Sequence, residues 1–244
     1  MISHWRTIVA SLLLLSAGCS SEPAPPPKPV SAANPNSGYG VVDHNTIRFV
    51  DNAQSNAATN TGVEPLKFID IQGNEVSLQD YLGKKHVVLV VTRGYAGSIC
   101  VYCSTQTSRL LNNYAKFTER DAEIVVVFPV ATPADSNRQT EFVASVKDRL
   151  DIPTDKIPFP IVLDISLKAV DQLGIRKDLS KPATYILDKE GQTRFAYVGE
   201  SLADRPSVQA LLDQLDLLQK DAAPKNEPAN EATSEPKPTV EQDS

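Results

Sequence analysis

The stretch TRGYAGSICVYCSTQTSRLL, residues 92–111, decides the fold because it joins an apolar run to a helical pattern. The run before it, HVVLVV (86–91), shows no alternation of apolar and polar residues, as expected of a strand buried on both faces. The pattern after it places apolar side chains on one face of a helix: Leu110, Leu111, Tyr114 and Phe117. Cys100 and Cys103 are therefore predicted at a strand-to-helix turn, where ligand sites gather in α/β sheets.

The same alternation of strands and helices continues along the chain. Apolar runs predict strands at AEIVVVFPV (122–130), FPIVLD (159–164), ATYILD (183–188) and RFAYVG (194–199). LKFIDIQGNEVSL (66–78) alternates around Gly73-Asn74 as a β-hairpin does. Helical faces are formed by Phe142, Val143, Val146 and Leu150, by Leu167, Val170 and Leu173, and by the residues after Pro206. This order predicts an α/β fold with a mixed central β-sheet flanked by helices on both faces.

The N-terminus, MISHWRTIVASLLLLSAGC, has the pattern of a signal peptide over residues 1–18. Its apolar run is shorter than the roughly 18–20 residues that span a bilayer. LSAGC resembles the lipobox of bacterial lipoproteins, with Ser16 where Leu is usual. That resemblance implies that Cys19 is lipidated and anchors the chain in a lipid bilayer, facing the periplasm. Ser20, which replaces the Asp of inner-membrane retention, favours the outer membrane; an ordinary cleaved signal with a chance cysteine is the alternative.

Composition divides the rest of the chain into a folded domain and two polar ends. Residues 20–38 are rich in Pro, Ser, Ala and Asn, so residues 19–61 are predicted to be a mostly disordered tether, although residues 39–50 could supply a short strand. The folded domain is predicted over 62–220, and 221–244 is predicted to be a disordered, acidic and Pro-rich tail. A formal net charge of −6 gives no reason to expect nucleic-acid binding.

The C-x-x-C spacing of Cys100 and Cys103 allows several kinds of site. A helix N-terminus favours thiolate, the nucleophile of disulfide exchange, so Cys100 could attack and Cys103 resolve the product. A structural disulfide closing so short a loop would stabilise the fold by only about 2 kcal/mol. A zinc site needs about four ligands, and outside the signal peptide only His44 and His86 could join the cysteines. Alternatively, the two cysteines are free thiols buried in the core. The βαβ setting in a secreted chain favours redox chemistry.

Pro182, in KPATYILDKEG, directly precedes a predicted buried strand. Proline cannot donate a hydrogen bond to a sheet, so it is expected at a strand start or in a special turn.

Four segments together resemble the redoxin, or AhpC/TSA, branch of the thioredoxin-like superfamily, over about residues 62–218: HVVLVVTRGYAGSICVYCSTQTSRL, PFPIVLD, AVDQLGI and KPATYILDKEGQTRFAYVGE. The resemblance implies a thioredoxin-like fold, with a cis Pro182 beside the cysteines and a substrate-docking loop at Pro182 and Ala183. Arg93 could lie near the thiolate or be a solvated loop charge. Tyr95 could line a substrate groove or pack the loop.

The resemblance leaves the activity open between related chemistries. Peroxiredoxins of this family carry a Thr three residues before the reactive cysteine and an Arg at the position of Pro182, whereas this chain has Gly97 and Pro182. These departures favour a thiol–disulfide oxidoreductase that reacts with protein disulfides or with an electron-donating dithiol protein. No cofactor and no metal ion are expected.

The alternatives to this activity are a thiol peroxidase that uses Cys100 on peroxides and a non-catalytic binding or copper-handling lipoprotein. Copper handlers of this fold usually add a downstream His, and the chain has none after His86.

Overall fold

The computed structural model describes residues 42–62, 65–151 and 153–222. The predicted signal peptide, Cys19 and almost all of the predicted acidic tail lie outside the described residues. Within the described residues no helix is both long and apolar enough to cross a membrane.

A seven-stranded sheet with the order β2-β1-β5-β4-β3-β8-β9 forms the centre of the domain. The three middle strands β5, β4 and β3 are parallel, and the outer pairings are antiparallel, which confirms the predicted mixed sheet. The strands are β1 (Lys67–Asp70), β2 (Glu75–Ser77), β3 (His86–Val91), β4 (Ala122–Val130), β5 (Ile161–Ile165), β8 (Ala183–Leu187) and β9 (Thr193–Val198). β6 (Arg176–Lys177) and β7 (Leu179–Ser180) form a separate two-stranded ribbon.

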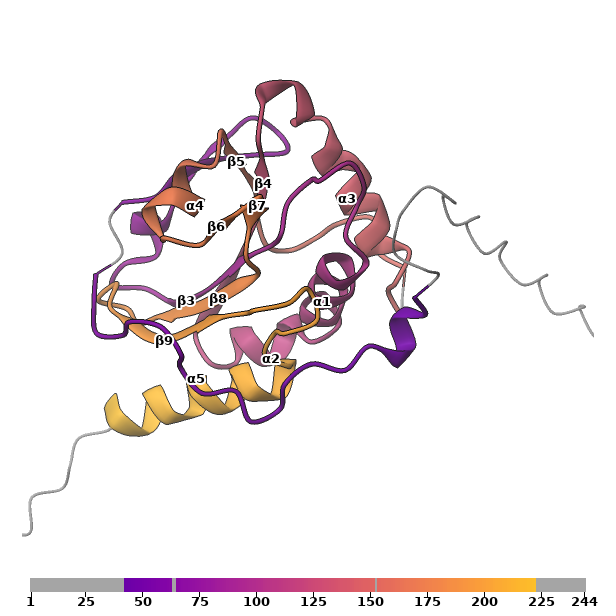
Figure 1. Ribbon diagram of the computed structural model, residues 1–244. Coiled ribbons are helices and arrows are strands. Elements are labelled where there is room, and N and C mark those ends of the chain that lie inside the picture. Colours follow the sequence, from indigo (N-terminus) through magenta and orange to yellow (C-terminus); the bar gives the residue numbers. More distant parts are fainter. Residues whose placement is uncertain (1–41, 63–64, 152, 223–244) are drawn as a thin grey trace, which may run out of the picture. The chain divides into compact units, whose positions relative to one another are not determined.

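Helices cover both faces of this sheet, as predicted (Figure 1). They are α1 (Val101–Asn112), α2 (Tyr114–Thr118), α3 (Arg138–Lys147), α4 (Lys168–Gln172) and α5 (Val208–Ala222), with short 3-10 turns at η1 (His44–Thr46), η2 (Leu78–Tyr81) and η3 (Pro133–Asp135). The apolar face predicted from Leu110 to Phe117 is shared by two helices, because the chain leaves helical geometry at Asn113. α1, α3 and α5 pack in one core layer, and α4 packs in the other.

β3 separates these two core layers and is buried along its whole length. Val88 and Val90 point into the layer that contains α1, whereas Val87, Leu89 and Val91 point into the layer that contains α4. Successive side chains of a strand point to opposite faces, so a strand between two layers has to be apolar throughout. The cysteine loop follows Val91 directly, so β3 is the rigid support of that loop.

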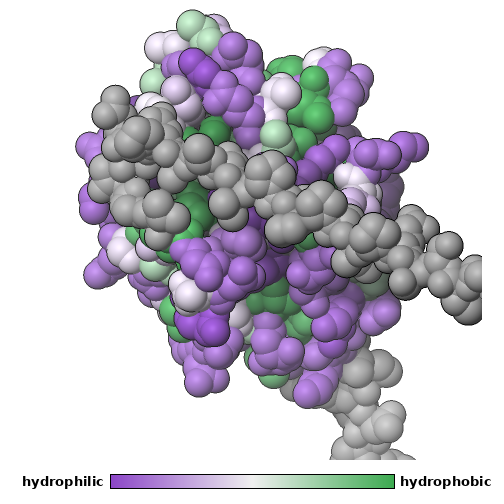
Figure 2. Space-filling view, turned by 90° about the vertical axis from the view of Figure 1, so that its right-hand side faces the viewer, coloured by the Kyte–Doolittle hydropathy of each residue, from purple (hydrophilic) through white to green (hydrophobic). Residues whose placement is uncertain are grey.

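Polar residues dominate the face of the domain shown in Figure 2, where hydrophobic residues appear in separate groups. The large hydrophobic side chains that are exposed in the described residues are Ile69, Ile71, Leu82 and Leu217. Most large apolar side chains of the described domain are therefore used in its two core layers.

Residues 47–62, named here the N-terminal strap, belong to the folded domain, which corrects the predicted boundary at residue 62 (Figure 1). Ile47 and Ala53 are only 5% and 2% exposed. The N–H of Asn56 donates to the Ala196 carbonyl at 2.9 Å, so the strap lies along β9, an edge strand that would otherwise present unpaired backbone groups. A composition rich in Asn and Ala predicts a loop, and it carries no signal for this pairing.

The strap also holds the loop between β9 and α5. The Val50 N–H donates to the Arg205 carbonyl at 2.8 Å, and the Ser207 N–H donates to the Val50 carbonyl at 2.9 Å. On the α1 side, Arg109 donates to the Ile47 carbonyl at 2.8 Å. The strap therefore connects α1 to the residues that precede α5.

Replacing Asn56 with Ala should destabilise the domain by about 1–2 kcal/mol, because two hydrogen bonds to β9 are lost. Asn56 Oδ1 accepts from the Val198 N–H at 2.8 Å, and its Nδ2 donates to the Val198 carbonyl at 3.1 Å. Asn52→Ala is the matched control, since Asn52 is exposed on the same strap. Chemical denaturation measures both free energies of unfolding, and equal effects of the two substitutions would contradict this role of the strap.

Candidate functional site

Cys100 and Cys103 lie at the start of α1, as predicted. Cys100 is the N-cap residue, and its Sγ accepts a hydrogen bond from the Cys103 N–H at 3.4 Å. The Cys100 carbonyl accepts from the Ser104 N–H at 3.0 Å, which begins the helical hydrogen bonding. Both cysteines are free thiols. The sulfur of Cys100 thus fills the place that a Ser or Asp oxygen often takes at a helix start.

The two thiols differ in exposure. Cys103 is 1% exposed and belongs to the core layer on the α1 side. Cys100 is only partly buried and packs at the margin of the same layer, with Ile99 and Tyr95. Cys100 is therefore the more accessible residue of the pair.

Arg205, which the sequence analysis did not identify, contacts Cys103 from the loop before α5. Its side chain is 1% exposed, and its Nη2 donates to the Cys103 Sγ at 3.2 Å. Nη1 donates to Gln106 Oε1 and Nε to the Leu202 carbonyl, both at 2.7 Å. Among the described residues no carboxylate forms an ion pair with Arg205. A lone Arg just before a helix carries no sequence signal for a position in the core.

The contacts around the two cysteines shift their pKa values in opposite directions. Burial opposes ionisation of Cys103, but the hydrogen bond from Cys100, the Arg205 charge and the Arg93 backbone N–H together lower the Cys103 pKa to about 6. The hydrogen bond to Cys103, followed by burial, raises the pKa of Cys100. The Arg205 charge therefore favours a thiolate on Cys103, whereas Cys103 and burial oppose ionisation of Cys100.

A second guanidinium, Arg149, approaches Cys100 from the end of α3. Arg149 donates to Ser145 Oγ at 2.7 Å, Ser145 Oγ lies 2.9 Å from Ser104 Oγ, and Ser104 Oγ donates to the Cys100 carbonyl at 3.3 Å. The Arg149 Nε is buried and has no hydrogen-bond partner among the described residues. Burial lowers the pKa of Arg149 while the charges of Asp148 and Cys100 raise it, so Arg149 lies within electrostatic reach of the Cys100 sulfur.

The structure brings Arg93 and Tyr95 to the loop that leads into α1. Arg93 contributes its backbone N–H to the Cys103 sulfur. The Tyr95 N–H donates to the Pro129 carbonyl at 3.1 Å, and the Arg138 guanidinium lies 5.0 Å from the centre of the Tyr95 ring. Tyr95 thus attaches the cysteine loop to the end of β4.

Gly94 and Gly97 give this loop its shape. Gly94 has φ +86°, and a Cβ on it would lie 2.2 Å from the Pro129 carbonyl oxygen. Gly97 has φ +83°, a conformation that L side chains rarely adopt, although the space around it is open. A Thr at position 97 would therefore strain this loop, which gives a physical reason for the departure from the peroxiredoxin pattern.

The prediction of a cis peptide bond at Pro182 is wrong, since the described residues contain no cis peptide bond. The trans form of an X–Pro bond is favoured by about 0.5–1 kcal/mol, and here it leads directly into β8. The Pro182 carbonyl accepts from the Gly199 N–H at 2.8 Å. Ala183 is the first residue of β8 rather than part of a loop, and at 3% exposure its side chain cannot contact a docking partner.

The two histidines weighed as metal ligands do not join the cysteines. His86 begins β3, at the opposite end from the cysteine loop, and His44 lies in η1. In the part of the chain that the structure describes, no three His, Cys, Asp or Glu side chains come together as a metal site would require. The charged groups beside the sulfurs are guanidinium groups, which repel a cation.

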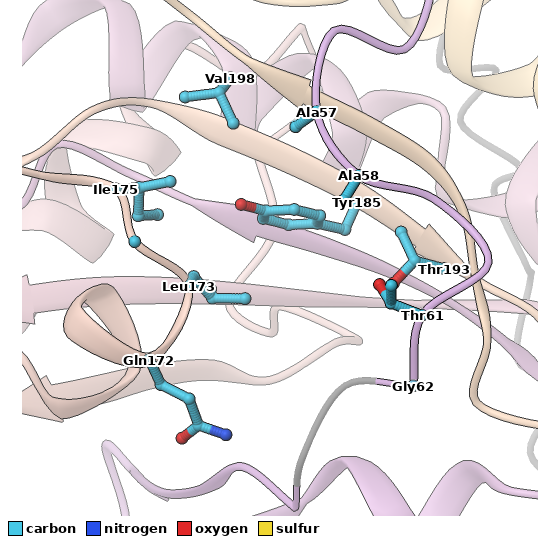
Figure 3. Close-up of a pocket in the computed structure, with 11 residues that line it drawn as sticks. Ala57, Ala58, Thr61, Gly62, Gln172, Leu173, Ile175, Tyr185, Thr193 and Val198 are labelled. Atoms are coloured by element: carbon cyan, nitrogen blue, oxygen red, sulfur yellow. The ribbon is translucent and has the colours of Figure 1, made fainter.

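A pocket of about 440 Å³ lies in the other core layer, between the strap, α4 and β8 (Figure 3). The Tyr185 ring lies across it, with Ile175 near its hydroxyl end and Thr61 near its other end. Burial raises the pKa of Tyr185 to about 12. Tyr185 belongs to the α4 layer and Cys103 to the α1 layer, so this pocket is not part of the cysteine site.

Comparison with known proteins agrees with this geometry. The AhpC/TSA family model matches residues 56–196. Similar solved structures include a reduced 2-Cys peroxiredoxin of Plasmodium vivax (20% identity, TM-score 0.53, 66% of this chain and 82% of that one). Thioredoxin peroxidase I of Plasmodium yoelii is similar as well, with 22% identity and a TM-score of 0.54 over 72% of this chain and 100% of that one. AhpC of Mycobacterium tuberculosis has 17% identity and a TM-score of 0.52 over 68% of this chain and 96% of that one.

No curated protein matches the chain. The structural similarities, at these identities, show a shared thioredoxin-like fold. The family match covers more than half of the chain, so the protein belongs to the AhpC/TSA family of thiol-dependent redox proteins.

Proposed function

We propose that the protein is a thiol–disulfide oxidoreductase in which Cys100 is the nucleophile and Cys103 the resolving thiol. The observation that carries the proposal is the position of the two sulfurs at the start of α1, with one thiol accessible and the other buried beside it. The hydrogen bond from the Cys103 N–H to the Cys100 sulfur keeps the two residues within reach of each other. The pair can close to a disulfide and reopen with little movement of the backbone.

The difference in exposure assigns the order of events. A protein disulfide can contact only Cys100, which then forms a mixed disulfide with one half of the substrate. The Cys103 backbone N–H already points at the Cys100 sulfur, at 3.4 Å, so the neighbouring thiol is placed to attack that mixed disulfide. The proposed partners are protein disulfides and an electron-donating dithiol protein.

A thiol peroxidase is the second candidate function, and the two guanidinium groups favour it. Arg205 beside Cys103 and Arg149 near Cys100 can stabilise the negative charge that develops on a departing oxygen. Membership of the AhpC/TSA family and the similar peroxiredoxin structures support this reading. The glycine at position 97 counts against it, because no hydroxyl side chain occurs where peroxiredoxins have theirs.

Cys103→Ser should accumulate a mixed disulfide with a model protein disulfide, because Cys100 still attacks and nothing resolves the product. Cys100→Ser should reduce that substrate no faster than the uncatalysed exchange. Mass spectrometry detects the mixed disulfide, and a turnover assay measures the rate. Unchanged turnover in Cys100→Ser would refute the proposal.

Stopped-flow reaction of the reduced protein with hydrogen peroxide separates the two candidates. A second-order rate constant no greater than that of free cysteine is expected for a disulfide exchanger. A much faster reaction that depends on Cys100 would establish the peroxidase instead.

We also propose that Cys19 carries a lipid anchor and that the domain works in the periplasm at the outer membrane. The support is the lipobox-like LSAGC at the end of the apolar N-terminal run. A single free cysteine pair in the folded domain suits a compartment in which disulfides persist.

Cys19→Ala should release the protein from the membrane fraction of bacterial cells that express the full chain. Metabolic labelling with a fatty acid should mark the wild-type chain and not the variant. Retention of the variant in the membrane fraction, or an unlabelled wild-type chain, would contradict lipid anchoring. Cys100→Ala is the matched control, since it removes a cysteine far from the lipobox and should leave the labelling unchanged.

A further inference from the structure

Arg205 is a buried cation that lacks a carboxylate partner. Arginine stays protonated in proteins, and a buried charge without a counter-charge is strongly destabilising. The acceptors of its three hydrogen bonds are the Leu202 carbonyl, Gln106 Oε1 and Cys103 Sγ. Of these three groups only the Cys103 thiol can become an anion.

The nearest acidic neighbour in sequence, Asp204, is engaged elsewhere. Its carboxylate accepts from the Tyr197 hydroxyl and from the Glu200 N–H, the latter at 2.9 Å. Asp204 therefore holds the loop before α5 against β9 and does not neutralise Arg205.

The guanidinium is fixed in position from several sides. Gln106, 3% exposed on α1, accepts from Arg205 Nη1. Hydrogen bonds from Val50 to the Arg205 carbonyl and from Ser207 to the Val50 carbonyl hold its backbone. The contact with the Cys103 sulfur is thus imposed by the fold.

Other groups around the two cysteines also shift their pKa values. Arg93, in the loop after β3, donates its backbone N–H to Cys103. The charges of Asp148 and Cys100 raise the pKa of Arg149, and the Arg205 charge lowers the pKa of Cys100 as well as that of Cys103. The Cys103 side chain and burial raise the pKa of Cys100, so the Cys100 thiol favours its protonated form.

We propose that Cys103 carries the negative charge of the reduced pair as the counter-ion of Arg205, and that it accepts the proton of Cys100 when Cys100 attacks. This inference rests on the proposed function, because it assumes that Cys100 is the attacking sulfur. It gives the buried cysteine a role before resolution, as the base that activates its neighbour. Arg205 then acts through Cys103 and is a positioning residue.

The steps balance as follows for a substrate disulfide R–S–S–R′. The proton of Cys100 moves to the Cys103 sulfur, the Cys100 sulfur bonds to the sulfur of R, and the S–S bond breaks to release R′S⁻. R′S⁻ takes the proton back from Cys103 and leaves as R′SH. The Cys103 thiolate then attacks Cys100, closes the protein disulfide and releases RS⁻. The two cysteines lose two electrons, and the substrate disulfide gains them.

Titration of Cys100→Ser and of Cys103→Ser, each combined with Cys19→Ala so that one cysteine remains, tests the inference directly, using the ultraviolet absorbance of thiolate. Cys100→Ser keeps Cys103 against Arg205 at 3.2 Å, and it should show one thiolate at neutral pH that is lost on acidification. Cys103→Ser removes the largest cause of the raised Cys100 pKa, but burial still opposes ionisation, so it should show less thiolate at neutral pH than Cys100→Ser. A thiolate at neutral pH in Cys103→Ser together with none in Cys100→Ser would overturn the inference.

Substitution of Arg205 in the Cys100→Ser background separates its charge from its structural role. Arg205→Gln should raise the titration midpoint of Cys103 by about 1–3 pH units, as expected for loss of an adjacent opposite charge. Arg205→Lys should restore part of that shift. Arg149→Gln is the matched control, because it removes a guanidinium near Cys100 and should leave the Cys103 midpoint unchanged. Equal shifts in Arg205→Gln and Arg149→Gln would contradict a specific Arg205–Cys103 pair.

The titration needs no substrate, so its failure is distinguishable from failure of the proposed function. Absence of turnover on disulfides with the titration as expected would refute the proposed function and leave the charge assignment standing. Circular dichroism and thermal unfolding identify variants that have lost the fold. If Arg205→Gln is one of them, the comparison of Cys100→Ser with Cys103→Ser still decides the inference.

Discussion

A guanidinium and a thiol meet in the core at the start of α1, where Arg205 Nη2 lies 3.2 Å from the Cys103 sulfur and both side chains are 1% exposed. A buried guanidinium is stabilised by an anion beside it. The surrounding structure holds the two groups together: the strap fixes the Arg205 backbone through Val50, and Gln106 orients the guanidinium. Cys100, which is only partly buried, is then the cysteine that can react with a substrate.

The central sheet and the cysteine pair could be predicted from the sequence because their signals are local. A strand between two core layers has to be apolar throughout, and β3 and β4 show this as unbroken runs. The hairpin of β1 and β2 shows its alternation and its turn residues. Cys100 and Cys103 are three positions apart at a helix start, so their proximity follows from the spacing alone.

The remaining parts of the site depend on contacts between residues far apart in the chain. Arg205 follows Cys103 by 102 positions, and nothing near Arg205 marks it as buried. The strap pairs with β9 through its own backbone and through the side chains of Ser55 and Asn56, and its Asn- and Ala-rich composition predicts only a loop. At Pro182 the family resemblance predicted a cis bond, whereas the chain enters β8 in the trans form, which its hydrogen bond with Gly199 accommodates.

Stabilisation of the thiolate favours the reduced pair, and a couple whose reduced form is stabilised is the more oxidising one. The most direct test is the reduction potential of the Cys100–Cys103 couple, measured in glutathione buffers with the two forms separated by alkylation and mass spectrometry. The account predicts a reversible couple above about −270 mV, the value of thioredoxin, and a lower potential in Arg205→Gln. A potential below that of thioredoxin, or a pair that forms no reversible disulfide, would contradict it.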